Sequence, residues 1–193
     1  MNKKIFLPFL AVALMLAGCV LSSCSSNNDE LKKATAKTAT LKSSLYIMDP
    51  MLDYCDITVT IGGETTALTA SNTTTTTYMG YNVRKYDIVS QSYTSFPQTI
   101  AIDAKCQPKE GYDLKSLGKS DYCFCIVSEI GNDNDDKFDH LVNSDSFLPT
   151  RNYKFDEVDE AKAKSQISRS INTTITFNTA SSADVAYKLA KLQ

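Results

Sequence analysis

The chain of 193 residues contains no tryptophan, one histidine and only seven glycines. Without tryptophan it lacks the aromatic side chain that sugar-binding sites commonly present as a platform. Because His140 is the single histidine, any Ser-His-Asp or Cys-His mechanism must use it. Neither a Gly-x-Ser-x-Gly nucleophile motif nor a glycine-rich phosphate loop is present. These absences argue against the common hydrolase and phosphate-binding sites.

The sequence also has no excess of positive charge and no long apolar run. Its formal net charge is -2, and it becomes -4 without residues 1–23, which contain Lys3 and Lys4 but no acid. A nucleic-acid partner is therefore not expected. The longest apolar run, Ile5 to Gly18, spans 14 residues and includes Pro8. A bilayer-spanning helix needs about 20 apolar residues, so we expect no transmembrane helix.

The first residues instead have the layout of a bacterial secretory leader: two lysines, an apolar run, and small residues around cysteine. The tetrapeptides LAGC, ending at Cys19, and LSSC, ending at Cys24, each resemble the lipobox of bacterial lipoproteins. This resemblance implies that one of these cysteines is acylated and becomes the mature amino terminus. It concerns the leader alone and implies processing and anchoring rather than an activity.

Cysteine parity favours Cys24 as the lipid carrier, with Cys19 as the alternative. Cleavage at Cys24 leaves four further cysteines, whereas cleavage at Cys19 leaves an odd number, which is unfavourable in an oxidising compartment. Neither cysteine is followed by aspartate, the inner-membrane retention signal of such lipoproteins. We therefore expect a protein anchored in the outer membrane by its lipid, facing the periplasm or the cell surface.

Composition divides the remainder into a tether and one domain. Residues 24–44 are rich in Ser, Thr, Lys and Ala and poor in large apolar side chains, so they are expected to form a flexible tether. Residues 45–193 are long enough to bury the core of a single domain. We therefore assign residues 1–23 to the leader, 24–44 to the tether and 45–193 to one β-rich domain.

The dominant period in that domain is two, which is typical of strands. Cys55 to Ile61 alternates apolar and polar residues before the Gly62-Gly63 turn, and Thr65 to Ala70 is expected to return as its partner. Asp121 to Ile130 is apolar on both faces, which predicts a central strand. Further predicted strands span Val83 to Val89, Thr99 to Cys106 and Asn172 to Asn178, and the threonine-rich Ser71 to Asn82 is an edge strand or a loop.

Helices are expected only late in the chain. Glu157 to Ile171 has a helix-forming composition with Asp156 as a candidate cap, and Val185, Leu189 and Leu192 predict one face of a terminal helix. This order of elements favours a mainly β fold, an antiparallel β-sandwich with short C-terminal helices. The alternative is an α+β fold with the helices packed on one face of an antiparallel sheet.

Four cysteines, Cys55, Cys106, Cys123 and Cys125, are disulfide candidates. Cys123 and Cys125 are separated by one residue on a strand, a poor geometry for a bridge between them. Two pairings remain: Cys55 with Cys123 and Cys106 with Cys125, or the reverse. We expect all four to meet in the core between the sheets with at least one bridge. The alternative is four unbridged cysteines acting as small apolar residues.

The remaining candidate residues carry weak signals. The acidic stretch Gly131 to Leu141 lacks the glycine and glutamate of a calcium loop, so a solvated turn is expected. His140 is more simply a surface residue than a catalytic base. The ten tyrosines could replace tryptophan in a glycan platform, and they include Tyr78, Tyr81, Tyr86 and Tyr93. We expect no catalytic residue, cofactor or metal site.

Three hypotheses of function follow. The first is a lipid-anchored envelope protein with a non-catalytic binding or structural role and a possible protein partner. The second is a lipoprotein that binds a glycan or another small ligand. The third, and least favoured, is a hydrolase that uses His140 or the acidic stretch. An exposed sheet edge or apolar patch would favour the first, and an exposed tyrosine-rich face the second.

Overall fold

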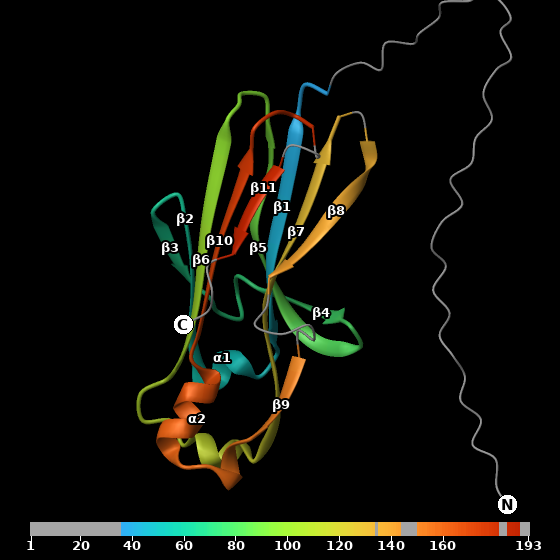
Figure 1. The fold of residues 1–193 in the computed structure, drawn as a ribbon. Coiled ribbons are helices and arrows are strands. Elements are labelled where there is room, and N and C mark those ends of the chain that lie inside the picture. Colours follow the sequence, from blue (N-terminus) through green and yellow to red (C-terminus); the bar gives the residue numbers. More distant parts are fainter. Residues whose placement is uncertain (1–35, 134, 144–149, 182–184, 190–193) are drawn as a thin grey trace, which may run out of the picture. The chain divides into compact units, whose positions relative to one another are not determined.

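The computed structural model describes residues 36–133, 135–143, 150–181 and 185–189, which belong to one compact unit, 34–193. This unit is a β-sandwich of two antiparallel sheets with a few short helices at one end (Figure 1). In the part of the chain that is described, no helix is long and apolar enough to cross a membrane.

The first sheet, called sheet A, has the strand order β4-β5-β1-β7-β8, and β9 pairs with the beginning of β7. Its strands are β1 (Ala39–Met48), β4 (Thr74–Tyr78), β5 (Tyr81–Tyr93), β7 (Lys119–Asn132), β8 (Asp135–Asn143) and β9 (Thr150–Lys154). β5, β1 and β7 each have neighbours on both sides, and β1 is the middle strand of sheet A.

The second sheet, called sheet B, has the strand order β11-β10-β6-β2-β3. Its strands are β2 (Cys55–Ile61), β3 (Glu64–Ala67), β6 (Gln98–Pro108), β10 (Arg169–Phe177) and β11 (Val185–Leu189). Gly62 and Gly63 form the turn between β2 and β3, and both have positive φ angles, 59° and 84°. Glycine adopts this conformation without the steric cost that a side chain would add.

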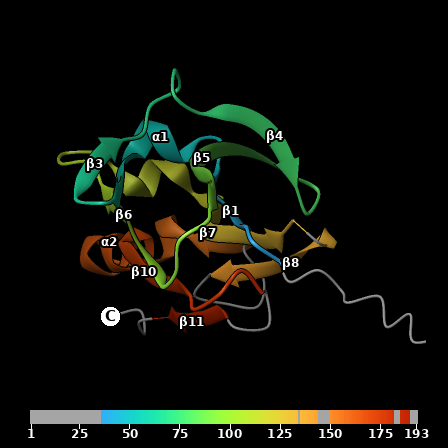
Figure 2. The ribbon, with the colours of Figure 1, turned by 90° about the horizontal axis from the view of Figure 1, so that it is seen from above.

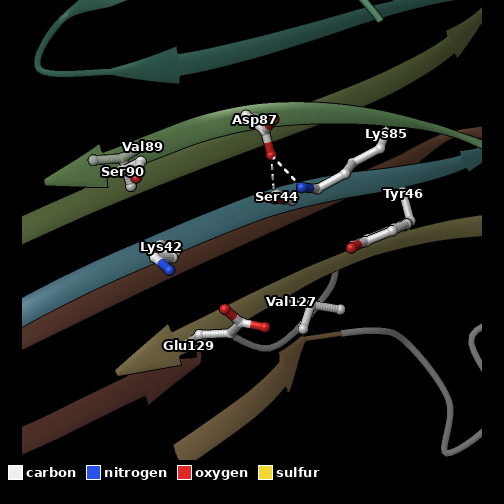
Figure 3. Close-up of a pocket in the computed structure, with 9 residues that line it drawn as sticks. All are labelled: Lys42, Ser44, Tyr46, Lys85, Asp87, Val89, Ser90, Val127 and Glu129. Atoms are coloured by element: carbon white, nitrogen blue, oxygen red, sulfur yellow. Dashed lines mark hydrogen bonds and ion pairs between the residues drawn. The ribbon is translucent and has the colours of Figure 1, made fainter. Parts of the chain in front are cut away.

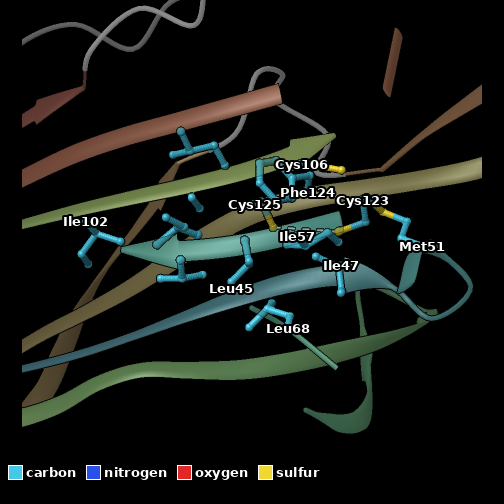
Figure 4. Packing of buried hydrophobic residues seen from close by; sticks show 14 of the residues in the cluster. Leu45, Ile47, Met51, Ile57, Leu68, Ile102, Cys106, Cys123, Phe124 and Cys125 are labelled. Atoms are coloured by element: carbon cyan, nitrogen blue, oxygen red, sulfur yellow. Dashed lines mark hydrogen bonds between the residues drawn. The ribbon is translucent and has the colours of Figure 1, made fainter. Parts of the chain in front are cut away.

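Much of the core lies between the two sheets (Figure 4), where side chains come from alternate strand positions, whereas β7 is buried on both of its faces. In β6 the inward residues Ile100, Ile102, Ala104 and Cys106 are buried, as the period of two predicts. Tyr93 of sheet A packs against Phe177 of sheet B, with ring centroids 5.8 Å apart. Apolar burial across this interface is the main stabilising contribution to the fold.

The short helices gather at one end of the sandwich rather than on a sheet face (Figure 1). They are α1 (Met51–Tyr54), α2 (Glu160–Ile167) and two 3-10 turns, η1 (Leu114–Leu117) and η2 (Phe155–Glu157). The Tyr122 hydroxyl of β7 donates a 2.9 Å hydrogen bond to the Ile167 carbonyl at the end of α2. The sandwich prediction is therefore confirmed, and the α+β alternative is not the fold of this chain.

The predicted tether extends too far toward the domain. Residues 39–44 belong to β1, paired with β5 on one side and β7 on the other. Ala39, Leu41 and Ser43 face the core, and the buried Ser43 and Ser128 hydroxyls are hydrogen-bonded at 2.7 Å. Leu41 is the one large apolar residue among residues 39–44, so the sequence pattern did not reveal that they belong to a central strand. Residues 24–35 of the predicted tether lie outside the described residues.

The predicted terminal helix is also wrong. Val185–Leu189 forms β11, which pairs with β10 at the edge of sheet B. The other predicted helix is shorter than expected: α2 spans only Glu160–Ile167, capped by the Asp159 carboxylate at 2.8 Å from the Lys162 amide, not by Asp156. Residues 169–171 belong to β10 and Val185–Leu189 to β11, so pairing with a neighbouring strand outweighs the helical propensity of both segments.

The threonine-rich segment forms the edge strand β4 within a hairpin with β5, and Figure 2 shows this hairpin arching at one side of the fold. The predicted return strand after Gly62-Gly63 is the short β3, which ends at Ala67. β7 is the central strand that the apolar residues on both its faces predict.

Candidate binding face of sheet A

The β4–β5 hairpin ends in a two-residue turn, Met79-Gly80, between the paired residues Tyr78 and Tyr81. Both turn residues have positive φ angles, 49° for Met79 and 84° for Gly80. Met79 is the only non-glycine residue with positive φ in the part of the chain that is described. Asparagine, aspartate or glycine normally occupies this position in such turns. The turn therefore holds methionine in a conformation that disfavours it.

The side chains at this turn also expose apolar surface to solvent. Met79 is 59% exposed and Tyr81 is 38% exposed, and among the described residues these two are the exposed large hydrophobic side chains. We call Tyr78, Met79, Gly80 and Tyr81 the hairpin tip. A strained residue that presents an apolar side chain to solvent is a candidate contact with a partner, because folding alone does not explain its retention.

Tyr78 of the hairpin tip forms a stacked pair with Tyr46 on the outer face of sheet A. The rings of Tyr46 and Tyr78 have centroids 4.5 Å apart and an interplanar angle of 25°. Tyr46 of β1 lies directly opposite Cys125 of β7, so both point to this outer face. Met48 and Val83 are paired on the same face and are buried. The stack thus covers a small cluster of buried apolar residues on the outer face of sheet A, which is continuous with the core.

The two cysteines of the Cys-Phe-Cys stretch belong to this outer cluster. Their sulfur atoms are 4.0 Å apart, and the Cys123 thiol lies 3.7 Å from the Tyr46 carbonyl oxygen. The contact with Cys123 and burial both raise the pKa of the Cys125 thiol. Burial, followed by the two nearby thiols, raises the pKa of Tyr78 to about 12. Cys125 and Tyr78 are therefore uncharged at neutral pH, so Cys125 lacks the thiolate that a nucleophile needs.

Beside the stack lies a polar groove of about 300 Å³ on the same face (Figure 3). Its lining comes from three adjacent strands, β5, β1 and β7. The residues are Lys42, Ser44, Tyr46, Lys85, Asp87, Val89, Ser90, Val127 and Glu129. A register shift between β1 and β5 at Ser43/Ser44 marks a bulge in this part of the sheet, where a strand bends. The groove contains two basic and two acidic side chains.

Ion pairing fixes the charge state of the groove. The Lys85 ammonium lies 2.6 Å from the Asp87 carboxylate, and the Ser44 hydroxyl donates a 2.8 Å hydrogen bond to the same oxygen. The hydrogen bond from Lys85 lowers the pKa of Asp87, and the same bond raises the pKa of Lys85. At the other end, Lys42 lies directly opposite Glu129 in the register. The pKa values of Lys85 and Asp87 are thus shifted away from neutrality, which disfavours proton transfer by these two groups at neutral pH.

The four described cysteines are free thiols and do not all face the space between the sheets, so the expected cross-sheet pairings are wrong. Cys55 and Cys106 lie on neighbouring strands of sheet B and face the main core, whereas Cys123 and Cys125 face outward from sheet A. All four are buried free thiols, and no disulfide joins them. The hydrogen bond with Cys106 raises the pKa of Cys55. The alternative of small, unbridged apolar residues describes them correctly.

The four candidate tyrosines do not form one platform. Tyr78 is stacked on Tyr46, whereas Tyr93 is buried against Phe177. Tyr86 lies opposite Leu45, on the core side of sheet A. Tyr81 alone of the four is exposed. Sequence reasoning missed Met79, for which the signal was a methionine directly before glycine in a short turn between two strands.

Within the acidic stretch, residues 131–132 end β7 and residues 135–141 belong to β8. Asp133 accepts hydrogen bonds from the backbone amides of Lys37 and Thr38 at 2.9 Å and 3.2 Å, and the Thr38 bond contributes most to lowering its pKa. His140 lies on β8 opposite Glu129 in the register. Within the described residues, no three His, Cys, Asp or Glu side chains form a group that could hold a metal. Cys19 and Cys24 lie outside the described residues.

Comparisons of the chain with protein-family models, with curated proteins and with solved structures find no match. The candidate function therefore depends on the geometry of this chain alone.

Proposed function

We propose that this chain is a lipid-anchored protein of the bacterial cell envelope that binds a protein partner without catalysis, through the hairpin tip and the adjacent groove. The observation that carries the proposal is the exposed Met79 at positive φ. A non-glycine residue in the left-handed region costs about 1 to 2 kcal/mol. Such a cost is retained where the side chain serves a contact outside its own fold.

The tip has the composition of an interface anchor. Methionine and tyrosine are enriched in the cores of protein interfaces, where their apolar area becomes buried. Tyr81 is exposed beside Met79, and the Tyr46–Tyr78 stack supports the hairpin from below. A rigid support lowers the entropy that is lost when a partner binds, which favours affinity.

The groove supports recognition rather than chemistry. Its lysines and carboxylates alternate across three strands, and the pKa shifts of Lys85 and Asp87 keep both groups charged. Fixed charges beside an apolar anchor orient a partner and exclude partners of the wrong charge pattern. Catalysis by proton transfer would instead need a group with a pKa near neutrality.

The leader supports the anchoring part of the proposal. Cys24, or alternatively Cys19, carries the lipid, and the anchor places the domain at the outer membrane. Labelling of cells with radioactive palmitate tests this part. We expect label in the wild-type chain and in Cys19→Ala, and no label in Cys24→Ala. Label lost only in Cys19→Ala would show that Cys19 carries the lipid. An unlabelled wild-type chain would refute lipidation.

The binding part is tested by a photoreactive amino acid placed at position 79 of the full chain in cells that export it. Position 105, an exposed lysine on sheet B, serves as the control site. We expect illumination to give a discrete cross-linked product from position 79 and none from position 105. Equal products from both positions, or none from either, would contradict the proposal.

Glycan binding remains the second candidate, because Tyr81 is exposed on β5, the strand that also supplies Lys85 and Asp87 to a groove with hydroxyl, amine and carboxylate groups. Such groups can hydrogen-bond sugar hydroxyls while an aromatic ring contacts the sugar face. A glycan array probed with the chain from Ser25 onward separates the two candidates. Binding that is lost in Tyr81→Ala and retained in Lys105→Ala would favour the glycan.

A further inference from the structure

β5 is much longer than the strand that covers its outer edge. β4 pairs only with Tyr81 to Lys85, so residues 86–93 of β5 have β1 as their one neighbouring strand within the described residues. The backbone of an uncovered edge strand offers N–H and C=O groups to another strand. Residue 88 has no partner on β1, which is a bulge, and the regular run beyond it is Val89 to Tyr93.

This run lacks the usual protection of an edge. Its sequence, VSQSY, contains no charged residue and no proline. Among the other edge strands, β3, β8 and β11 contain charged residues, and β4 is a short strand rich in threonine. Charges and proline normally prevent edge-to-edge association of sheets. Their absence leaves Val89 to Tyr93 open to pairing.

Space for an additional strand lies beside the run. A groove of about 640 Å³ borders it at the open side of the sandwich. Val89, Gln91 and Tyr93 line the groove from sheet A. From sheet B come the apolar side chains of Ile61, Ile100 and Ile102, together with the polar residues around them. An incoming strand that extends sheet A would place alternate side chains into this groove.

The run is complementary to itself. If two copies pair antiparallel about Gln91, Val89 of one copy lies opposite Tyr93 of the other, and Ser90 lies opposite Ser92. Gln91 then lies opposite its own counterpart, where two amides can hydrogen-bond. Aromatic residues opposite β-branched residues are favourable cross-strand pairs, and no like charges meet. A two-fold axis through Gln91 satisfies the symmetry of an isologous dimer.

The pairing also brings the first residues of the two β1 strands toward each other. Ala39, the first residue of β1, lies opposite Tyr93 in the register. In the paired arrangement the two Tyr93 residues are offset by four positions, about 13 Å along the strand direction. Both tethers would thus leave from one region, which suits anchoring in a single membrane. This last point alone rests on the proposed lipid anchor.

We propose that two copies of this chain associate through antiparallel pairing of Val89 to Tyr93, which joins their A sheets into one continuous sheet. Five residues on each side form a small interface, so the dimer is weak and depends on concentration. The occupant of the groove beside β5 is the second copy.

Sedimentation velocity of the chain from Ser25 onward, over a wide range of concentrations, tests the proposal. We expect the mass to rise from that of a monomer to twice that value as concentration increases. Gln91→Lys places like charges at the two-fold axis and should leave a monomer at every concentration. Ala67→Lys, on the exposed edge strand β3, should leave the dimer intact. Circular dichroism must show that both variants remain folded.

A cross-linking variant gives an independent measurement. Gln91→Cys places a thiol next to its own counterpart across the axis, so mild oxidation should give a covalent dimer, whereas Ala67→Cys should not. A wild-type chain that stays monomeric throughout, or a dimer that Gln91→Lys leaves intact, would overturn the proposal. Neither result concerns residue 79 or the lipid, so the proposed function would stand or fall separately.

Discussion

Tyr78 of the β4–β5 hairpin stacks on Tyr46 of β1 with ring centroids 4.5 Å apart, and the pair covers the thiols of Cys123 and Cys125. This contact holds the hairpin over the outer face of sheet A. It therefore links the exposed tip to the centre of the sheet, where β1 and β7 pair.

Removal of the Tyr78 ring should expose the thiols of Cys123 and Cys125. Tyr78→Ala is expected to lower the free energy of unfolding by about 2 kcal/mol, because a half-buried aromatic side chain is lost. It should also increase the rate at which iodoacetamide alkylates the native chain at Cys123 and Cys125. Tyr81→Ala removes an exposed ring from the same hairpin and is the control. Equal alkylation rates in the two variants would contradict the role of the stack.

The thiols themselves should be free and protected. For the chain from Ser25 onward, we expect four reactive thiols after denaturation without reductant and almost none before it. The hydrogen bond with a neighbouring thiol, followed by burial, raises the pKa of Cys55 and of Cys125, which suppresses the reactive thiolate in the folded state. Titration with a chromogenic disulfide reagent gives both counts. Two thiols, or none, in the denatured chain would show that bridges form.

The buried hydroxyl pair between β1 and β7 should stabilise the centre of sheet A. Ser43→Ala leaves the Ser128 hydroxyl without its 2.7 Å partner and should lower the free energy of unfolding by about 1 to 3 kcal/mol. The double variant Ser43→Ala/Ser128→Ala should be less destabilised than the sum of the two single variants. Thr40→Ala, which removes an exposed hydrogen bond to Ser92, is the control and should have little effect. Additive losses in urea unfolding would argue against a coupled pair.

The ion pair of the groove should give a small pH dependence. The pKa of Asp87 is lowered by folding, so its contribution is present at neutral pH and is lost as pH falls below about 4. The pKa of Lys85 is raised, so its contribution is present below about pH 10 and is lost at higher pH. Asp87 is largely exposed and Lys85 is partly exposed, so the effect should stay below about 1 kcal/mol.

Comparison of wild type with Asp87→Asn at several pH values measures this contribution. The difference in the free energy of unfolding should be largest near neutrality and should disappear in acid. A difference that grows as pH falls would reverse the sign and refute the pairing.

The sequence predicted the sandwich where residues alternate strongly. Cys55 to Ile61 and Thr99 to Cys106 lie in strands with the expected inward residues, and the apolar faces around Cys123 and Cys125 identified a central strand. The prediction failed where pairing partners decide the structure. Residues 39–44 are weakly apolar yet lie between β5 and β7, and Val185–Leu189 forms a strand because β10 offers an edge.

The candidate site was harder to predict for a related reason. Which face of β7 meets the core depends on its register with β1, and this register places Cys125 opposite Tyr46 on the outer face. A one-residue slip would have reversed this outcome. The positive φ angle of Met79 follows from the length of the turn between paired strands, which a run of threonines and tyrosines does not reveal.

The claim that the hairpin tip is retained for a partner can be tested by relieving its strain. Met79→Asn creates an Asn-Gly turn, which accepts positive φ at both positions. We expect this variant to raise the free energy of unfolding by about 1 kcal/mol in urea denaturation. In the same variant, a photoreactive residue at position 81 should give much less cross-linked product than in the wild type. A variant that is no more stable, or that cross-links as well as the wild type, would contradict the proposed role of Met79.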